Sequence, residues 1–204
     1  SNNRGNEALR VAENRINRNP ESAIGYRVKG AVLNSLFLGD QAIDCYTRAI
    51  ELEPTNANLY ASRSNSYVLE GMPEPALKDC EKAAELGMNN PELLNSQMLA
   101  CIELQKYDSA LDICNQLLKL DPGRELQYLL NRATIYRKMN NYSEALLDLD
   151  SILESDSNDI RSLIGRAYIY FIQGRVKEAQ QEIRKAEAVT KVKDEYGYLS
   201  RAYA

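Results

Sequence analysis

The sequence predicts an all-α protein, an α-solenoid in which a pair of helices repeats along the chain. The first observation is a period. Alanines recur at Ala8, Ala42, Ala76, Ala110, Ala145 and Ala179, in steps of 34, 34, 34, 35 and 34 residues. The second is that apolar residues around Ala42 fall at the spacing of one helix face. A fixed period of this size is typical of repeat arrays.

The segment 39–56 shows the pattern most clearly. Ala42, Tyr46 and Ala49 lie on one face, where the two alanines let another helix approach and Tyr46 fills the space between them. Asp40 stands where an N-cap is expected, and Pro54 follows the last turn, where a helix does not easily continue. The segment therefore predicts one amphipathic helix with a defined start and end.

The period divides the chain into units that we expect to form a single domain over 1–204. Residues 6–22 match only the second helix of a truncated unit. Complete units follow at 23–56, 57–90, 91–124, 126–159 and 160–193. We expect 194–204 to form a closing helix or the start of a sixth unit. Both ends stop within a unit, so we expect apolar edges there to be exposed unless they are capped.

The first helix of each unit carries a large residue, a small one and an aromatic or large one at fixed spacing, most weakly in the third unit. The sets are Tyr26, Gly30 and Leu33; Tyr60, Ser64 and Tyr67; Leu94, Met98 and Cys101; Leu129, Ala133 and Tyr136; and Leu163, Ala167 and Tyr170. With the period, these residues make the chain resemble the tetratricopeptide repeat (TPR) family. The resemblance implies antiparallel helix pairs stacked into a right-handed superhelix whose first helices line a concave groove. It implies no specific activity.

Composition narrows the function classes. The net charge of -4 argues against nucleic acid as the main partner, because phosphate binding usually needs a basic surface. No apolar run reaches the length of about 18 residues that a membrane-spanning helix needs. We expect a cytoplasmic location. The alternative is an exported or membrane-anchored bacterial protein whose targeting segment has been removed.

Residues for catalysis are scarce. The chain has no histidine, no nucleophile motif and no glycine-rich phosphate loop, so we expect no catalytic residues, no cofactor and no metal site. The four cysteines contain no CxxC pair. Cys80, Cys101 and Cys114 fall at packing positions, where a free thiol behaves as a small hydrophobe. A disulfide or redox role is the alternative.

The outward residues of the first helices are the candidate binding site. The concave groove is predicted to present Arg27, Asn58, Asn65, Asn95, Asn131, Arg161, Tyr168 and Phe171. Asparagine amides both donate and accept hydrogen bonds, which suits the backbone of an extended peptide. The alternative for the asparagines is a merely solvated groove. Tyr168 is either a ligand anchor or a packing residue of the C-terminal segment.

Another series of residues, which we call the ladder, contributes one residue per unit: Lys29, Arg63, Gln97, Arg132 and Arg166. Co-chaperone members of the family clamp a C-terminal carboxylate with Lys, Asn and Arg residues. That clamp fails here, because Leu99 and Gly165 stand where Asn and a cation are needed in one frame, and Ala31 and Glu92 in the other. We expect a structural ladder whose charged ends meet carboxylates on a neighbouring helix.

The sequence therefore predicts a non-catalytic interaction module, a scaffold or adaptor that binds an extended peptide or a partner domain in the concave groove. The alternative is a structural segment of a longer TPR protein, whose open ends stack on further repeats or mediate self-association. An enzyme is the weakest class. The partner is expected to be a protein or peptide.

Overall fold

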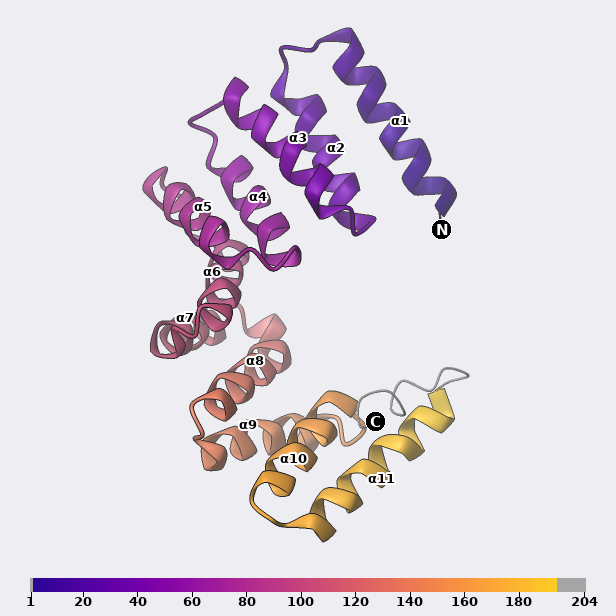
Figure 1. Ribbon diagram of the computed structural model, residues 1–204, viewed down its shortest axis with the longest axis vertical. Coiled ribbons are helices and arrows are strands. Elements are labelled where there is room, and N and C mark those ends of the chain that lie inside the picture. Colours follow the sequence, from indigo (N-terminus) through magenta and orange to yellow (C-terminus); the bar gives the residue numbers. More distant parts are fainter. Residues whose placement is uncertain (1, 194–204) are drawn as a thin grey trace. The chain divides into compact units, whose positions relative to one another are not determined.

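The computed structural model describes residues 2–193, with side chains described from residue 5 to residue 190. The segment 194–204, expected to be a closing helix or a sixth unit, lies outside the described residues. Within 2–193 the chain is all-α, an α-solenoid of paired helices as predicted (Figure 1). The helices are α1 Asn2–Arg18, α2 Ala23–Ser35, α3 Gly39–Leu52, α4 Ala57–Leu69, α5 Pro73–Glu85, α6 Pro91–Glu103, α7 Tyr107–Leu120, α8 Glu125–Lys138, α9 Tyr142–Ser155, α10 Ile160–Ile172 and α11 Val176–Lys193, with a short 3-10 helix at Pro122–Arg124.

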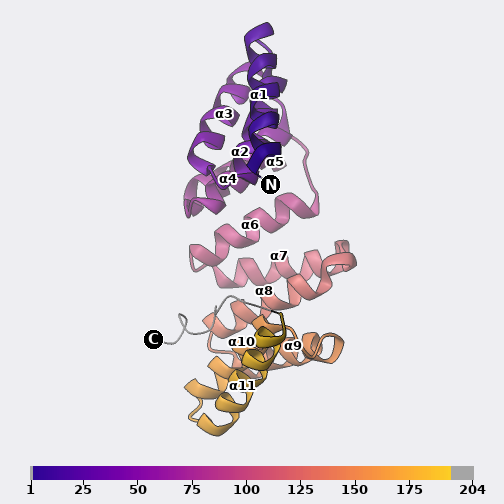
Figure 2. The ribbon, with the colours of Figure 1, turned by 90° about the vertical axis from the view of Figure 1, so that its right-hand side faces the viewer.

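The chain divides into two compact units, Ser1–Ile113 and Cys114–Ala204, and the division falls inside α7. In the first unit α2 packs on α3, α4 on α5, and α3 on α4 (Figure 1). In the second unit α8 packs on α9 and α10 on α11, with α9 against α10 (Figure 2). The single domain over 1–204 and its repeat boundaries remain predictions.

The periodic alanines hold the helix crossings together, as the sequence predicts. Five of them are buried, with at most 3% of their surface exposed: Ala42, Ala76, Ala110, Ala145 and Ala179. Ala8 is only half-buried. Between Ala42 and Ala49, the Tyr46 side chain is 3% exposed and packs where Gly30 of α2 has no side chain. Small residues thus let α2 and α3 meet around one aromatic ring.

The same turn joins the two helices of each pair. One residue adopts a left-handed conformation, and the next donates a backbone hydrogen bond to the carbonyl five residues earlier, as in a Schellman motif. The left-handed residues are Phe37, Gly71, Gln105, Asn140 and Gly174, with φ from 58° to 74°. Glycine and asparagine accept this conformation easily, whereas phenylalanine does not.

The start of α3 differs from the prediction. The helix begins at Gly39, and its N-cap is Leu38, so the expectation that Asp40 caps it was wrong. The Leu38 carbonyl already accepts a hydrogen bond from the Ala42 backbone N–H at 3.1 Å. The turn leads straight into the helix, and this leaves Asp40 in its first turn.

Candidate functional site

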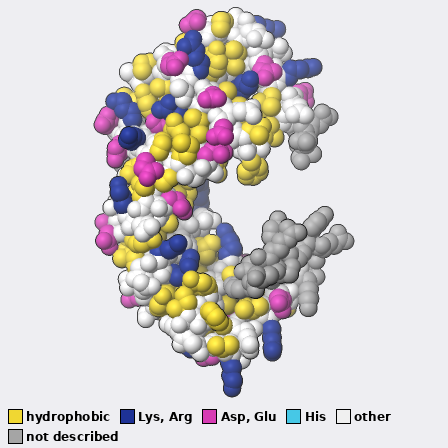
Figure 3. Space-filling model, in the orientation of Figure 1, with side chains coloured by type: hydrophobic (Ala, Val, Ile, Leu, Met, Phe, Trp, Pro, Cys, Tyr) yellow, Lys and Arg dark blue, Asp and Glu magenta, His cyan; other side chains and the backbone are white. Residues whose placement is uncertain are grey.

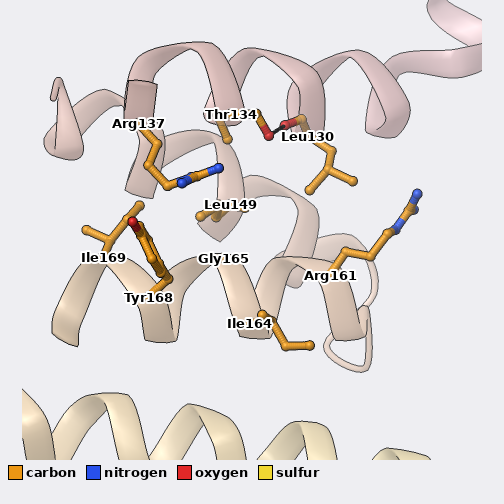
Figure 4. A pocket seen from close by; sticks show the side chains of 10 residues that line it. Leu130, Thr134, Arg137, Leu149, Arg161, Ile164, Gly165, Tyr168 and Ile169 are labelled. Carbon is orange, nitrogen blue, oxygen red and sulfur yellow. Dashed lines mark hydrogen bonds between the residues drawn. The ribbon is translucent and has the colours of Figure 1, made fainter. Parts of the chain in front are cut away.

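A pocket of about 400 Å³ opens between α8 and α10 in the second unit (Figure 4). Leu130, Thr134 and Arg137 of α8 line one side, and Arg161, Ile164 and Tyr168 of α10 line the other. These are first helices of adjacent pairs. The residues lie at helical spacing because one face of each helix is turned toward the pocket. Acidic and basic side chains are otherwise mixed over the visible surface (Figure 3).

The floor of the pocket comes from α9, the second helix of the pair that begins with α8. Leu149 of α9 is 3% exposed and belongs to a buried cluster with Ala133 and Ile169. It reaches the pocket because Gly165 carries no side chain: a Cβ there would lie 3.3 Å from the Leu149 methyl groups. The small residues Ala133 and Gly165 therefore open an apolar floor between α8 and α10.

Arg137 and Tyr168 close one end of the pocket. The Arg137 guanidinium carbon lies 4.8 Å from the centre of the Tyr168 ring, and the two side chains face one another in Figure 4. This is cation–π geometry. No carboxylate pairs with Arg137 among the described residues, so its donors remain available to a ligand. Tyr168 keeps 41% of its surface exposed.

Arg161 lies at the other end of the pocket (Figure 4). Its contacts are long: Nη1 donates to Gln127 Oε1 at 3.3 Å, and Nη2 lies 3.4 Å from Asp159 Oδ2. Asp159 is also the N-cap of α10, where its side chain accepts from the Ser162 backbone N–H at 2.8 Å. Burial works to raise the pKa of Asp159, but the Ser162 hydrogen bonds and Arg161 outweigh it, and the pKa is lowered. The pocket thus has an apolar floor with a cation at each end.

The structure brings two of the predicted site residues, Arg161 and Tyr168, into this pocket. Phe171 is 65% exposed on α10 but does not line it. Asn131 is half-buried and accepts a 3.4 Å hydrogen bond from Gln127, one turn earlier in α8. The other predicted residues lie in the first unit: exposed Arg27, Asn58 and Asn65, and half-buried Asn95. Whether these asparagines form a polar strip remains a prediction.

Sequence reasoning missed Arg137 and Leu149. On α8, Arg137 lines the pocket, whereas its neighbour Lys138 is exposed and does not line it. The signal was the spacing from Leu130, because seven residues return to the same helix face within about 20°. Spacing along α8 or α10 does not point to Leu149, because it belongs to α9, the second helix of its pair.

The ladder is structural, as expected. Arg63 of α4 donates from Nε and Nη2 to Asp79 of α5 at 2.7 and 2.8 Å. Arg132 of α8 holds Asp148 of α9 with the same fork. In α10, Arg166 donates from Nε and Nη2 to Glu182 Oε2 at 3.1 and 2.5 Å.

Each of these carboxylates is at most 6% exposed and lies 16 residues after its arginine. Burial works to raise the pKa of Glu182, but hydrogen bonds from Lys185 and Arg166 overcome it, and the pKa is lowered. The first residue of the ladder, Lys29, instead reaches Glu13 of α1 at 2.9 Å. At the third unit the cation and the carboxylate are both replaced, by Gln97 and by Ile113 sixteen residues later.

The cysteines are free and take packing roles. Cys80, Cys101 and Cys114 are buried, and Cys45 is half-buried. The Cys114 thiol donates to the Tyr128 carbonyl at 3.2 Å, and the Cys80 sulfur lies 2.9 Å from the Ser64 hydroxyl oxygen. Burial raises the pKa of Cys80 to about 11 and that of Cys114 to about 12. These thiols therefore stay protonated at neutral pH.

The described residues also bear on metal sites and on membrane-spanning helices. No group of three or more His, Cys, Asp or Glu side chains within that part of the chain is placed to hold a metal ion. No helix in it combines the length and the apolar character needed to cross a membrane.

Comparison with known proteins agrees with the fold. A family model described as "Tetratricopeptide repeat" matches residues 130–191, which contain the pocket. Rat sperm-associated antigen 1 is 40% identical over 67 residues, 32% of this chain and 7% of that protein. Human tetratricopeptide repeat protein 13 is 24% identical over 191 residues, 91% of this chain and 21% of that protein. The chain thus spans less than a quarter of these curated relatives.

Among solved structures, YrrB, described as a TPR protein with an unusual peptide-binding site, superposes with a TM-score of 0.68. The two are 22% identical, and the match covers 90% of this chain and 94% of YrrB. At this identity the likeness concerns the fold alone.

Proposed function

Because the chain belongs to the tetratricopeptide repeat family, we propose that it is a non-catalytic interaction module that holds an extended protein segment between α8 and α10. TPR proteins generally mediate protein–protein interaction. The observation that carries the proposal is the pocket itself, with Leu149 at its floor, Leu130 and Ile164 on its sides, and Arg137 and Arg161 at its ends. Binding pockets typically combine an apolar lining with a few polar groups that fix orientation.

The chemistry of the pocket indicates the kind of segment. An apolar side chain would lie over Leu149. Its burial there would stabilise the complex by about 25 cal/mol for each Å² of apolar surface removed from water. Acidic side chains on either side would face Arg137 and Arg161. Arg137 is the stronger of the two sites, because it already stacks on Tyr168 and has no carboxylate partner among the described residues. A fork of guanidinium donors fits a carboxylate with two hydrogen bonds.

The ladder arginines support the same proposal because they are already paired within the chain. Arg63, Arg132 and Arg166 each donate hydrogen bonds to a buried carboxylate. Arg137 and Arg161 do not, and both line the pocket. Two cations whose donors are not held by a buried carboxylate therefore lie at the ends of the pocket.

The test is selection of linear peptides from a random display library on the purified chain, followed by affinity measurement. The variants are Tyr168→Ala and Arg137→Gln. Leu147→Ser is the matched control, because Leu147 is a 66% exposed apolar residue of α9 outside the pocket. We expect enrichment of an apolar residue flanked by acids, with binding at least about tenfold weaker in both pocket variants and unchanged in the control.

Two outcomes contradict the proposal. Selected peptides that bind the pocket variants as tightly as the wild type would place the ligand elsewhere. Failure to enrich any peptide would favour the alternative, a structural segment of a longer TPR protein. That no peptide with an acidic chaperone-type C-terminal tail is clamped remains a prediction, because Ala31, Glu92, Leu99 and Gly165 stand at the positions of the clamp residues.

A further inference from the structure

Phe37 has an unfavourable backbone conformation that its side chain does not offset by burial. It is left-handed at φ 58°, where the corresponding turns carry Gly71, Gln105, Asn140 and Gly174. A bulky aromatic residue is unfavourable in this conformation. Its side chain is 86% exposed, so it gains no burial in return. Strain that the fold does not need points to a role outside it.

Phe37 belongs to an apolar surface that we name the acidic turn face. Its apolar residues come from the turn after α2 and from the end of α4 and the turn that follows it: Phe37, Leu38, Leu69 and Met72, each at least 40% exposed. The two turns touch, because the Glu70 side chain lies against Gly39, which has no side chain of its own. Figure 3 shows hydrophobic side chains at the surface of this unit.

The charges on this face have one sign. Asp40, Glu70 and Glu74 are exposed within the same two segments, 37–40 and 69–74, which contain no Lys or Arg. None of the three forms an ion pair among the residues that the structure describes. A partner surface should therefore offer apolar side chains flanked by cations.

The second unit carries a surface of that kind, which we name the basic turn face. At the end of α10 and the start of α11, Phe171, Ile172 and Val176 are 65%, 44% and 47% exposed. Arg175 and Lys177 flank them. Arg175 is held by Glu178 at 3.0 Å and by the Tyr170 ring, 4.1 Å from its centroid, whereas Lys177 forms no ion pair among the described residues. The segment 171–178 thus has two cations against one carboxylate.

We infer that the acidic turn face of one molecule binds the basic turn face of a second copy of this chain. Apolar side chains would cover one another, and opposite charges would face each other around them. Two acidic turn faces would repel, so the contact is between unlike surfaces. Both faces are small, and the association is therefore weak and transient. This contact is independent of the pocket between α8 and α10.

The first experiment is sedimentation velocity of the wild-type chain from low to high micromolar concentration. The sedimentation coefficient is expected to rise with concentration, and added salt should reduce the rise by screening the charges. Phe37→Asn should weaken self-association at least about tenfold. Asparagine suits this turn, as Asn140 shows, so the variant keeps its fold. Leu147→Ser, outside both faces, is the control.

The second experiment uses the charges. Glu70→Lys damages the acidic turn face, and Lys177→Glu damages the basic one, so each variant alone should associate more weakly than the wild type. Mixed together they should recover association, because the Lys177→Glu chain keeps an intact acidic face and the Glu70→Lys chain keeps an intact basic face. A wild-type chain that stays monomeric throughout overturns the inference. So does a mixture no more associated than its components.

Discussion

Arg132 of α8 and Asp148 of α9 are joined by two parallel hydrogen bonds, 2.9 Å from Nε to Oδ2 and 2.6 Å from Nη2 to Oδ1. Asp148 is only 5% exposed, and both of its carboxylate oxygens accept from this one guanidinium. The third guanidinium nitrogen, Nη1, donates to Asn115 at 2.9 Å. The pair therefore links α8 to α9 and to the helix before them.

Arg132→Leu is expected to lower the free energy of unfolding by about 3–5 kcal/mol, because it leaves a buried carboxylate without a partner. The double variant Arg132→Gln, Asp148→Ile should recover most of the loss, since Gln97 and Ile113 stand at these places in the third unit. Urea titration measures both. Arg48→Leu is the control: its pair with Glu51 is exposed and should be worth less than about 1 kcal/mol. Equal losses in Arg132→Leu and Arg48→Leu would contradict the prediction.

Gly30→Ala is expected to destabilise the chain by about 0.5–2 kcal/mol. The new Cβ would lie 2.9 Å from the Tyr46 ring, which is 3% exposed and cannot move aside, and such overpacking costs about 1–3 kcal/mol. The better helix propensity of alanine offsets up to about 1 kcal/mol of this cost. Gly123→Ala is the matched control, because its Cβ would meet only Asp121 Oδ1, at 3.5 Å. A thermal midpoint that is raised in Gly30→Ala would show that the α2–α3 contact is looser than described.

Phe37→Asn is expected to stabilise the monomer by about 0.5–1 kcal/mol, since a left-handed backbone costs a residue such as phenylalanine about 1–2 kcal/mol. Little is lost in exchange, because the Phe37 side chain is 86% exposed. Thermal unfolding at low concentration measures the change. A lower midpoint would mean that the aromatic ring contributes to the fold.

Alkaline pH is expected to destabilise the chain through its buried thiols. An unfolded cysteine titrates near 9.0, whereas the pKa values of Cys80 and Cys114 are raised to about 11 and about 12 by burial. Their contribution is complete below pH 9.0 and is lost as the pH rises through the folded pKa values, because the unfolded chain releases protons that the folded chain retains.

The measurement is the free energy of unfolding between pH 9 and pH 11 for the wild type and for Cys80→Ala, Cys114→Ala. The variant should fall less steeply with pH, although cavities make it less stable at neutral pH. Parallel profiles for the two proteins would rule the thiols out as the cause.

The sequence alone predicts the helix pairs and the buried alanines, because a repeat imposes the same packing on each unit. It also predicts the role of Arg63, Arg132 and Arg166, since their position before the small residue recurs with the period. It does not resolve Arg137 from Lys138, because an apolar or polar stripe covers a wide arc of a helix. Nor does it find the Leu149 floor, which depends on what the absent side chain of Gly165 uncovers in the next layer.

The offset of 16 residues in the ladder bears on how such a chain can lengthen or shorten. Arg63, Arg132 and Arg166 each pair with a buried carboxylate on the other helix of their own pair, which we call a helix hairpin. Toward the preceding hairpin they contact uncharged Thr47 and Asn115, or Asp150, whose side chain is 47% exposed to water. A gene duplication or deletion of one whole hairpin would therefore carry each buried charge together with its counter-charge. Recombination could therefore change the number of repeats without producing a protein that has an unpaired charged side chain in its core.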